Sequence, residues 1–317
     1  MEQEEKELSR DVVKELGLDK LEVITSEMLK GYTSIGTGAF RKCIYLTSIT
    51  LPNSVTKIGE HAFFGCHSLT TINIPNSVTN IQDGAFYNCS SLRTVNLPNN
   101  MTSIGECAFF LCSNLKNIKI PEGITSISQS TFNGCSNLRN IIIPNSVIRI
   151  GDSAFKHCYS LRTITIPDSV TSIGKSAFHG CYDLKSIIIP NSVIYFGADA
   201  FYGCYKLSSV IIGDKSYEIQ KVVENKCKAY KAFNADMTCR NFQYKEGNTY
   251  QIKGEPKICE HGFHACLNLT DVFTYYGGII GKDIVIHEVE LNYVSVEKDD
   301  EDSKVVAKKI TIGKRIL

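Results

Sequence analysis

The sequence predicts an α/β solenoid, in which short units stack into a rod, followed by a small α+β domain. The first reason is that several residue types recur every 23 residues over more than half of the 317-residue chain. The second is that each unit contains a short stretch of alternating apolar residues, typical of a strand, that ends at a proline, which cannot donate to a strand ladder. The third is that the repeat stops at Gly213, after which the pattern changes.

Four residue types mark the repeat: cysteine, phenylalanine, leucine and proline. The cysteines are Cys43, Cys66, Cys89, Cys112, Cys135, Cys158, Cys181 and Cys204, and the phenylalanines precede them by three residues, from Phe40 to Phe201. Eight units therefore run over residues 29–212, and the first has Leu29 where the others have proline. Such columns without insertions indicate one structural unit repeated eight times.

The unit ending at Leu97 shows why the repeats must stack. Leu92, Val95 and Leu97 give a short alternating strand, which Pro98 ends because proline has no N–H for a ladder. Phe86 and the neighbouring Ala and Cys form a further inward cluster. A single unit cannot bury this many apolar side chains, so neighbouring units must cover each other.

The pattern L-x-x-I-x-I-P-x-x-V-x-x-I-G-x-x-A-F-x-x-C-x-x-L resembles the BspA-type leucine-rich repeat. The resemblance covers residues 29–212. It implies a right-handed superhelix of eight 23-residue units, with short parallel strands forming a sheet on one face. It also implies a non-enzymatic scaffold that recognises proteins through its surface.

Residues 1–28 are expected to form an N-terminal helical cap, with a helix over residues 3–17. Leu8, Val12, Val13 and Leu16 would share one helix face, and Gly17 has the place of a C-cap. A solenoid needs such a cover over its open first coil.

Two surface columns are the candidate partner-binding residues. The residue after the repeat leucine gives five successive cations: Arg93, Lys116, Arg139, Arg162 and Lys185. The residue after the repeat cysteine gives Tyr159, Tyr182 and Tyr205. Stacked like charges repel, so an acidic protein surface would relieve them. The alternatives are a solvated face that keeps the rod soluble and a tyrosine stack that only stabilises it.

A third column, which faces outward from the strands, becomes apolar toward its C-terminal end, where it holds Ile142, Ile188 and Ile211. We expect the C-terminal domain to cover it. Overall charge argues against nucleic acid as the partner, because the chain carries a net charge of only +1.

The 13 cysteines are mostly explained by the repeat. The eight in the column point the same way and are expected to be buried free thiols, while Cys107 lies off the column. No apolar stretch approaches the length of a membrane span, and no signal peptide is visible. We therefore expect a cytoplasmic protein, with a surface or host-delivered location left open, as are the oligomeric state and the source.

Residues 213–317 are expected to form an α+β domain with a helix over 216–233 and strands near 284–296 and 304–312. An acidic run, residues 297–302, would join the two strands. Residues 228–266 resemble an uncharacterised bacterial and phage domain of unknown function. Residues 257–272 also align with residues 57–72, so a stray repeat is the alternative to a separate domain.

Three interpretations of the chemistry of this domain compete. A metal site would use Cys259, His261, His264 and Cys266, although their spacing matches no common zinc pattern. A divergent ADP-ribosyltransferase-like effector is suggested by similarity of the stretch from Gly262 to Tyr276. That resemblance implies a nicotinamide pocket lined by Tyr230, His264 and Tyr276, with Glu288 or Glu290 orienting the ribose. The preferred interpretation is a non-catalytic module that needs no cofactor and caps the solenoid.

Overall fold

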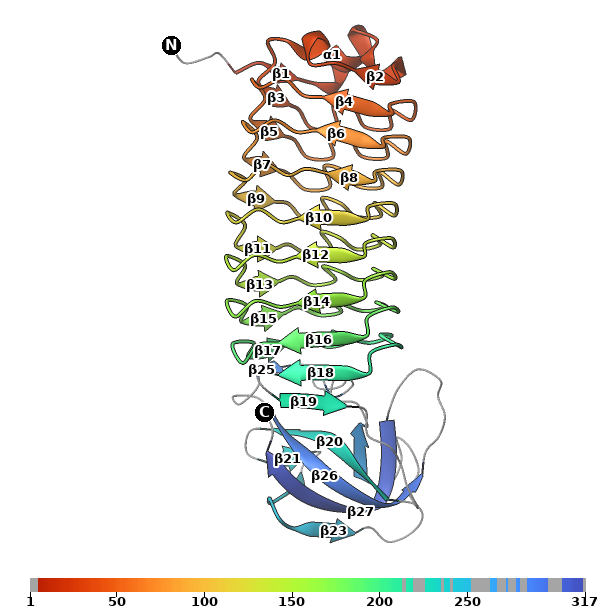
Figure 1. Cartoon of the computed structure of the whole chain (residues 1–317), viewed down its shortest axis with the longest axis vertical. Coiled ribbons are helices and arrows are strands. Elements are labelled where there is room, and N and C mark those ends of the chain that lie inside the picture. Colours follow the sequence, from red (N-terminus) through yellow and green to blue (C-terminus); the bar gives the residue numbers. More distant parts are fainter. Residues whose placement is uncertain are drawn as a thin grey trace.

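The computed structural model shows a long rod of stacked coils with a small domain at its C-terminal end (Figure 1). It describes residues 5–212, 215–218, 226–234, 237–239, 242–251, 263–266, 272, 278–279, 284–295 and 304–315. Within these residues no helix has the length and apolar character needed to cross a bilayer.

The main strand column contains the alternating stretch of each unit. Its members are β2 (Val23–Ile24), β4 (Ser48–Thr50), β6 (Thr71–Asn73), β8 (Thr94–Val95), β10 (Asn117–Lys119), β12 (Asn140–Ile142), β14 (Thr163–Thr165), β16 (Ser186–Ile189) and β18 (Ser209–Ile212). Neighbours pair in parallel, with Ile118 opposite Ile141 for example, except that β12 and β14 belong to separate sheets. The parallel strands predicted from the repeat are confirmed.

A second strand column, which the sequence analysis did not predict, runs along another side of the rod. It consists of β1 (Glu7–Leu8), β3 (Ser34–Ile35), β5 (Lys57–Ile58), β7 (Asn80–Ile81), β9 (Ser103–Ile104), β11 (Ser126–Ile127), β13 (Arg149–Ile150), β15 (Ser172–Ile173) and β17 (Tyr195–Phe196). These strands also pair in parallel, with a break between β9 and β11. The expectation of a sheet on one face alone was therefore incomplete.

The N-terminal segment forms a ninth coil as well as a cap. β1 pairs with β3 through Leu8 and Ile35, and β2 pairs with β4. The helix expected over residues 3–17 is shorter: α1 spans Arg10–Glu15, and Leu8 lies in a strand. Gly17 takes the left-handed conformation beyond the helix end, with φ of 67°. Short 3-10 helices follow at Leu18–Lys20 and Glu27–Leu29.

The core of the rod is a continuous stack of repeat phenylalanines. Successive rings from Phe40 to Phe201 lie parallel, with centroids 5.2 Å apart at Phe40–Phe63 and 5.7 Å apart at Phe109–Phe132. The column cysteines are buried free thiols, as predicted. Each Sγ–H from Cys66 onward donates to the carbonyl of a phenylalanine in the preceding coil, as Cys66 does to Phe40 at 3.0 Å. These bonds and rings hold each coil to the next.

The C-terminal domain meets the last coil edge to edge. β19 (Lys215–Glu218) pairs antiparallel with β18, and β25 (Gly278–Ile279) pairs antiparallel with β17, so both strand columns are closed at this end (Figure 1). Ile211 lies opposite Ser216 and is half-buried. Ile142 and Ile188 remain 66% and 43% exposed, so the expected cover over the apolar column extends only to its last member.

The described remainder of the domain is an antiparallel sheet. It contains β20 (Lys226–Asn234), β23 (Thr249–Gln251), β24 (Phe263–Cys266), β26 (Ile284–Ser295) and β27 (Lys304–Arg315), and a small hairpin joins β21 (Thr238–Cys239) to β22 (Phe242–Gln243). The two strands predicted from the sequence correspond to β26 and β27. The helix predicted over 216–233 is wrong, because these residues include β19 and β20. Nine consecutive pairs with β26 hold β20 extended, from Lys226↔Asn292 to Asn234↔Ile284.

Candidate partner-binding site

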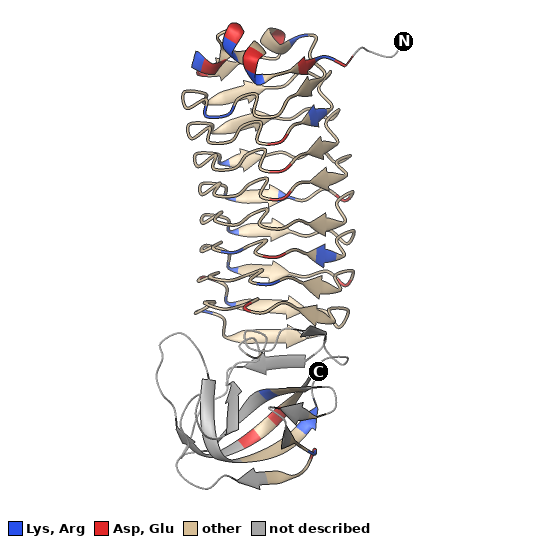
Figure 2. Ribbon diagram, turned by 180° about the vertical axis from the view of Figure 1, so that it is seen from behind, with Lys and Arg blue, Asp and Glu red and all other residues tan. Residues whose placement is uncertain are grey.

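The five cations stand one per coil at the edge where the main strands begin, and they form the basic stripe. Figure 2 shows a row of separate blue segments along the rod. Each of them, Arg93, Lys116, Arg139, Arg162 and Lys185, is exposed and directly precedes a strand of the main column. Backbone hydrogen bonds join neighbouring members: Lys116 N donates to Arg93 O at 3.2 Å, and Arg139 N donates to Lys116 O at 3.0 Å. The coil spacing of about 4.8 Å thus brings like charges close together.

No cation of the basic stripe forms a salt bridge within the described rod. The Lys–carboxylate pairs described in the structure join Lys30 to Glu27 and Lys206 to Asp183. Asp183 lies beside the stripe, and its pKa is lowered by the hydrogen bond from Lys206 and by positive charges that include Arg162 and Lys185. Among the described residues, the stripe cations themselves make no salt bridge, so their charge is open to a partner.

The tyrosine ladder shares two coils with the basic stripe, those of Arg162 and Lys185, and continues into the next coil. The rings of Tyr159 and Tyr182 stack with centroids 4.7 Å apart, and those of Tyr182 and Tyr205 stack at 5.2 Å. The three side chains are 39%, 40% and 52% exposed. Partial burial raises the pKa of Tyr159, so its hydroxyl stays protonated at neutral pH. The ladder therefore joins three coils and still leaves part of each tyrosine accessible at the surface.

Aromatic stacking between coils also occurs away from this site. Phe64, Tyr87 and Phe110 form a second ladder on the early coils, with centroids 4.9 Å and 4.5 Å apart. Ring stacking alone therefore serves to join coils. The tyrosine ladder differs from this second ladder because Tyr159 and Tyr182 precede the stripe cations Arg162 and Lys185 by three residues.

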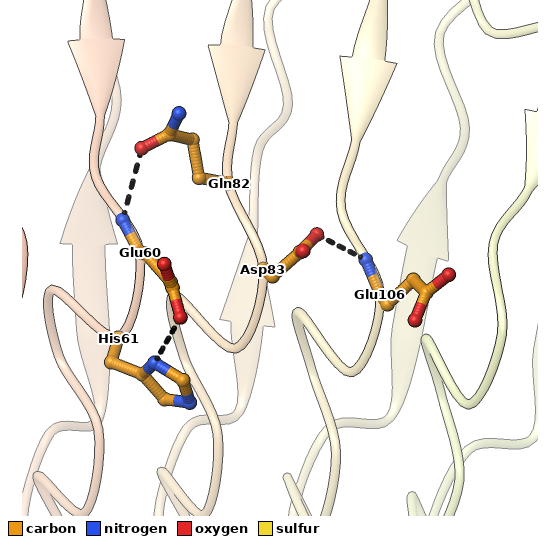
Figure 3. A network of polar contacts seen from close by, with 5 residues as sticks. All are labelled: Glu60, His61, Gln82, Asp83 and Glu106. Atoms are coloured by element: carbon orange, nitrogen blue, oxygen red, sulfur yellow. Dashed lines mark hydrogen bonds and ion pairs between the residues drawn. The ribbon is translucent and has the colours of Figure 1, made fainter.

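The acidic side chains at the glycine turns have a structural role. In Figure 3 the Asp83 carboxylate accepts a hydrogen bond from the backbone N–H of Glu106 at 2.8 Å. The side-chain oxygen of Gln82 accepts one from the backbone N–H of Glu60 at 3.1 Å. Gln82 stands where most units have glycine, and its side-chain oxygen is the acceptor at this turn. His61 Nδ1 lies 3.2 Å from Glu60 Oε1. The first two contacts join the turns of successive coils, and they occupy the Asp83 and Gln82 side chains.

The proposed enzymatic residues are only partly described. Tyr230 on β20 lies opposite Glu288 on β26 and Cys266 on β24 in the strand register, and His264 lies on β24. Glu288 is half-buried and Glu290 is exposed. Tyr276 lies outside the described residues, so the assembly of a nicotinamide pocket stays a prediction.

Two of the four proposed metal ligands lie within the described residues and two lie outside them. His264 and Cys266 lie on β24, while Cys259 and His261 lie outside the described residues. In the part of the chain that the structure describes, no three His, Cys, Asp or Glu side chains gather as metal ligands would. The acidic run over 297–302 also lies outside the described residues, as does most of the segment over 257–272.

A groove beside the basic stripe was not anticipated from the sequence. It has a volume of about 880 Å³ and lies over β12, β14 and β16, where Ile142, Thr165 and Ile188 line it. The apolar outward column indicated these residues, but a contact with the C-terminal domain was expected there. The site therefore has three parts: the basic stripe, the tyrosine ladder and this groove.

The two strand columns and the 23-residue coil place the chain in the class of leucine-rich-repeat solenoids. The sequence profile of the BspA type leucine rich repeat region matches six copies over residues 20–138 and 102–231. The chain belongs to the BspA-type leucine-rich repeat family. A second profile, a domain of unknown function (DUF7666), matches residues 227–317, which supports a separate C-terminal domain over a stray repeat.

Solved structures with similar repeats come from several bacteria. A leucine rich repeat protein of T. pallidum is 28% identical, with 59% of this chain and 78% of that chain covered and a TM-score of 0.43. A leucine-rich repeat protein from Bacteroides ovatus is 33% identical, with 57% of this chain and 59% of that chain covered and a TM-score of 0.39. Among curated proteins, the comparison found no match.

Proposed function

We propose that this protein is a recognition scaffold that binds an acidic protein surface through the basic stripe and the tyrosine ladder. The observation that carries the proposal is the row of five exposed cations, on five successive coils, without a salt bridge to any described carboxylate. Repulsion along such a row is relieved when a partner supplies carboxylates.

The rigidity of the rod supports recognition. The inward cysteines and stacked phenylalanines hold every stripe residue to a fixed backbone, so little backbone ordering opposes binding. Tyrosine is enriched at protein interfaces because its ring contributes apolar area and its hydroxyl a hydrogen bond. The tyrosine ladder thus adds contact area next to the charges, which favours a protein partner over a ligand that binds through charge alone.

Panning a displayed library of short random peptides against the full chain tests the proposal. We expect the wild type to enrich acidic peptides, and we expect a triple reversal, Arg139→Glu with Arg162→Glu and Lys185→Glu, to lose them. The matched control reverses three exposed cations away from the stripe, namely Lys57, Arg149 and Lys175, and so has the same net charge.

The comparison of the two triple variants decides the proposal. Enrichment by the control variant, together with its loss in the stripe variant, supports binding at the stripe. If both variants enrich the peptides that the wild type enriches, the stripe is a solvated face and the proposal is wrong. Exposed charges are screened by salt, so the enrichment should also weaken as ionic strength rises.

A further inference from the structure

The groove over β12, β14 and β16 lies where the main sheet is interrupted. Along this column, Lys116 N donates to Arg93 O, Arg139 N donates to Lys116 O, and Lys185 N donates to Arg162 O. Between the coils of β12 and β14 the structure shows no equivalent bond from Arg162 N to Arg139 O, and the two strands are unpaired. The interruption coincides with the groove, whose lining comes from both coils.

Two isoleucines lie on the floor of the groove. Ile142 and Ile188 are 66% and 43% exposed, and the outward Thr165 lies between them on the intervening strand. The far side is formed by the proline turns, including Pro167 and Pro190. Neither described strand of the C-terminal domain that joins the rod reaches this floor, since β19 pairs with β18 and β25 pairs with β17. Two large aliphatic side chains thus face solvent within one concave surface.

The basic stripe runs next to the groove without lining it. Arg139 and Arg162 directly precede Asn140 and Thr163, which line the groove, and Lys185 directly precedes the first residue of β16. Asp168 also lines the groove. An occupant would therefore lie over the two isoleucines and next to the cations of the basic stripe.

We infer that this groove binds an extended acidic peptide segment that also carries aliphatic side chains. The inference rests on the proposed function and names the partner's chemistry: carboxylates for the basic stripe, and leucine-like side chains for Ile142 and Ile188. Three coils span about 10 Å, which is the length of about three residues of an extended chain. A short linear motif fits this length.

The two isoleucines on the floor distinguish this occupant from other polyanions. A sulfated glycan or a single-stranded nucleic acid would satisfy the stripe, but neither has aliphatic side chains to bury on two isoleucines. Each of these is therefore an outcome of the test.

Fluorescence anisotropy of a labelled synthetic peptide that alternates Asp and Leu tests the inference on the full chain. The comparison ligands are a peptide of equal charge that alternates Asp and Ser, a heparin-derived oligosaccharide and an oligothymidylate. We expect the Asp–Leu peptide to bind tightest. Replacing Ile142 and Ile188 by serine should weaken its binding on the order of tenfold, because about half of each side chain is available for burial.

The chain contains a closely matched control for that double variant. Ile148 and Ile194 have the same separation of two coils and are 48% and 52% exposed, but they lie beside the second strand column. Their replacement by serine should leave binding unchanged.

The outcomes separate the groove from the proposed function. If the Asp–Ser peptide binds as tightly as the Asp–Leu peptide, or if the Ile142/Ile188 variant binds like the wild type, the groove inference is overturned while the stripe stands. Absence of Asp–Leu binding, or tighter binding of the oligosaccharide or the oligothymidylate, also overturns it. If the triple stripe reversal binds the Asp–Leu peptide unchanged, the proposed function fails as well.

Discussion

The phenylalanine stack allows a quantitative test of what holds the rod together. Phe109 is fully buried, and its ring stacks on Phe86 at 5.3 Å and on Phe132 at 5.7 Å. Truncation to alanine removes a buried aromatic side chain, which costs about 3–5 kcal/mol. The value should lie at the upper end, because two stacked pairs of about 0.5–1.5 kcal/mol each are lost together. Urea unfolding followed by far-UV circular dichroism measures the loss.

Phe110, the next residue, provides the control. It is half-buried and stacks on one neighbour, Tyr87, at 4.5 Å. Phe110→Ala should therefore cost about 1 kcal/mol, because one exposed stacked pair is lost without a cavity in the core. Equal losses in Phe109→Ala and Phe110→Ala would refute the reasoning, since stability would then depend on the aromatic content of a coil and not on the central stack.

Three further predictions concern the thiols, the interrupted ladder and the C-terminal domain. Burial raises the pKa of Cys43 to about 11 from 9.0, so iodoacetamide at pH 8 should alkylate it about a hundredfold more slowly than an ordinary thiol and more slowly than the half-buried Cys107, as peptide mass spectrometry would show. Equal labelling would contradict this, and the rate should rise about tenfold per pH unit and level off only near pH 11. The amide of Arg162 should exchange its hydrogen faster than that of Lys185, because only the latter has a ladder acceptor, and equal protection would show that the ladder is intact. An ADP-ribosyltransferase-like pocket around His264 requires that NAD raise the unfolding temperature of the full chain, and an unchanged temperature excludes it.

The repeat made most of the rod predictable, because every unit repeats the same inward residues. Once Phe86 and Cys89 are recognised as members of columns, their burial follows from the need of each coil to cover the next. The same periodicity placed the basic stripe and the tyrosine ladder correctly on the surface. These features depend on spacing alone, which a sequence shows directly.

Features without the regular spacing were missed. Leu8 and Ile24 occupy the inward positions of a first coil, but they precede Ile35 and Ile49 by 27 and 25 residues, so the column is hidden. The helix predicted over 216–233 includes most of β20, which is a strand in the structure. Its conformation is fixed by pairing with β26, at least 50 residues further along the chain. Long-range pairing of this kind overrides local propensity.

The groove shows a different limit of sequence reasoning. A 23-residue period states which residues share a column, but it assumes that every coil meets the next in the same way. Between β12 and β14 the strand pairing is interrupted although the spacing continues unbroken through Ile142 and Thr165. The core contacts between these two coils are kept, since Cys158 still donates to Phe132 at 3.2 Å. The core therefore tolerates an interruption of strand pairing that changes only the surface. Binding specificity in such a rod can therefore arise from small departures in stacking as well as from the side chains that vary between its coils.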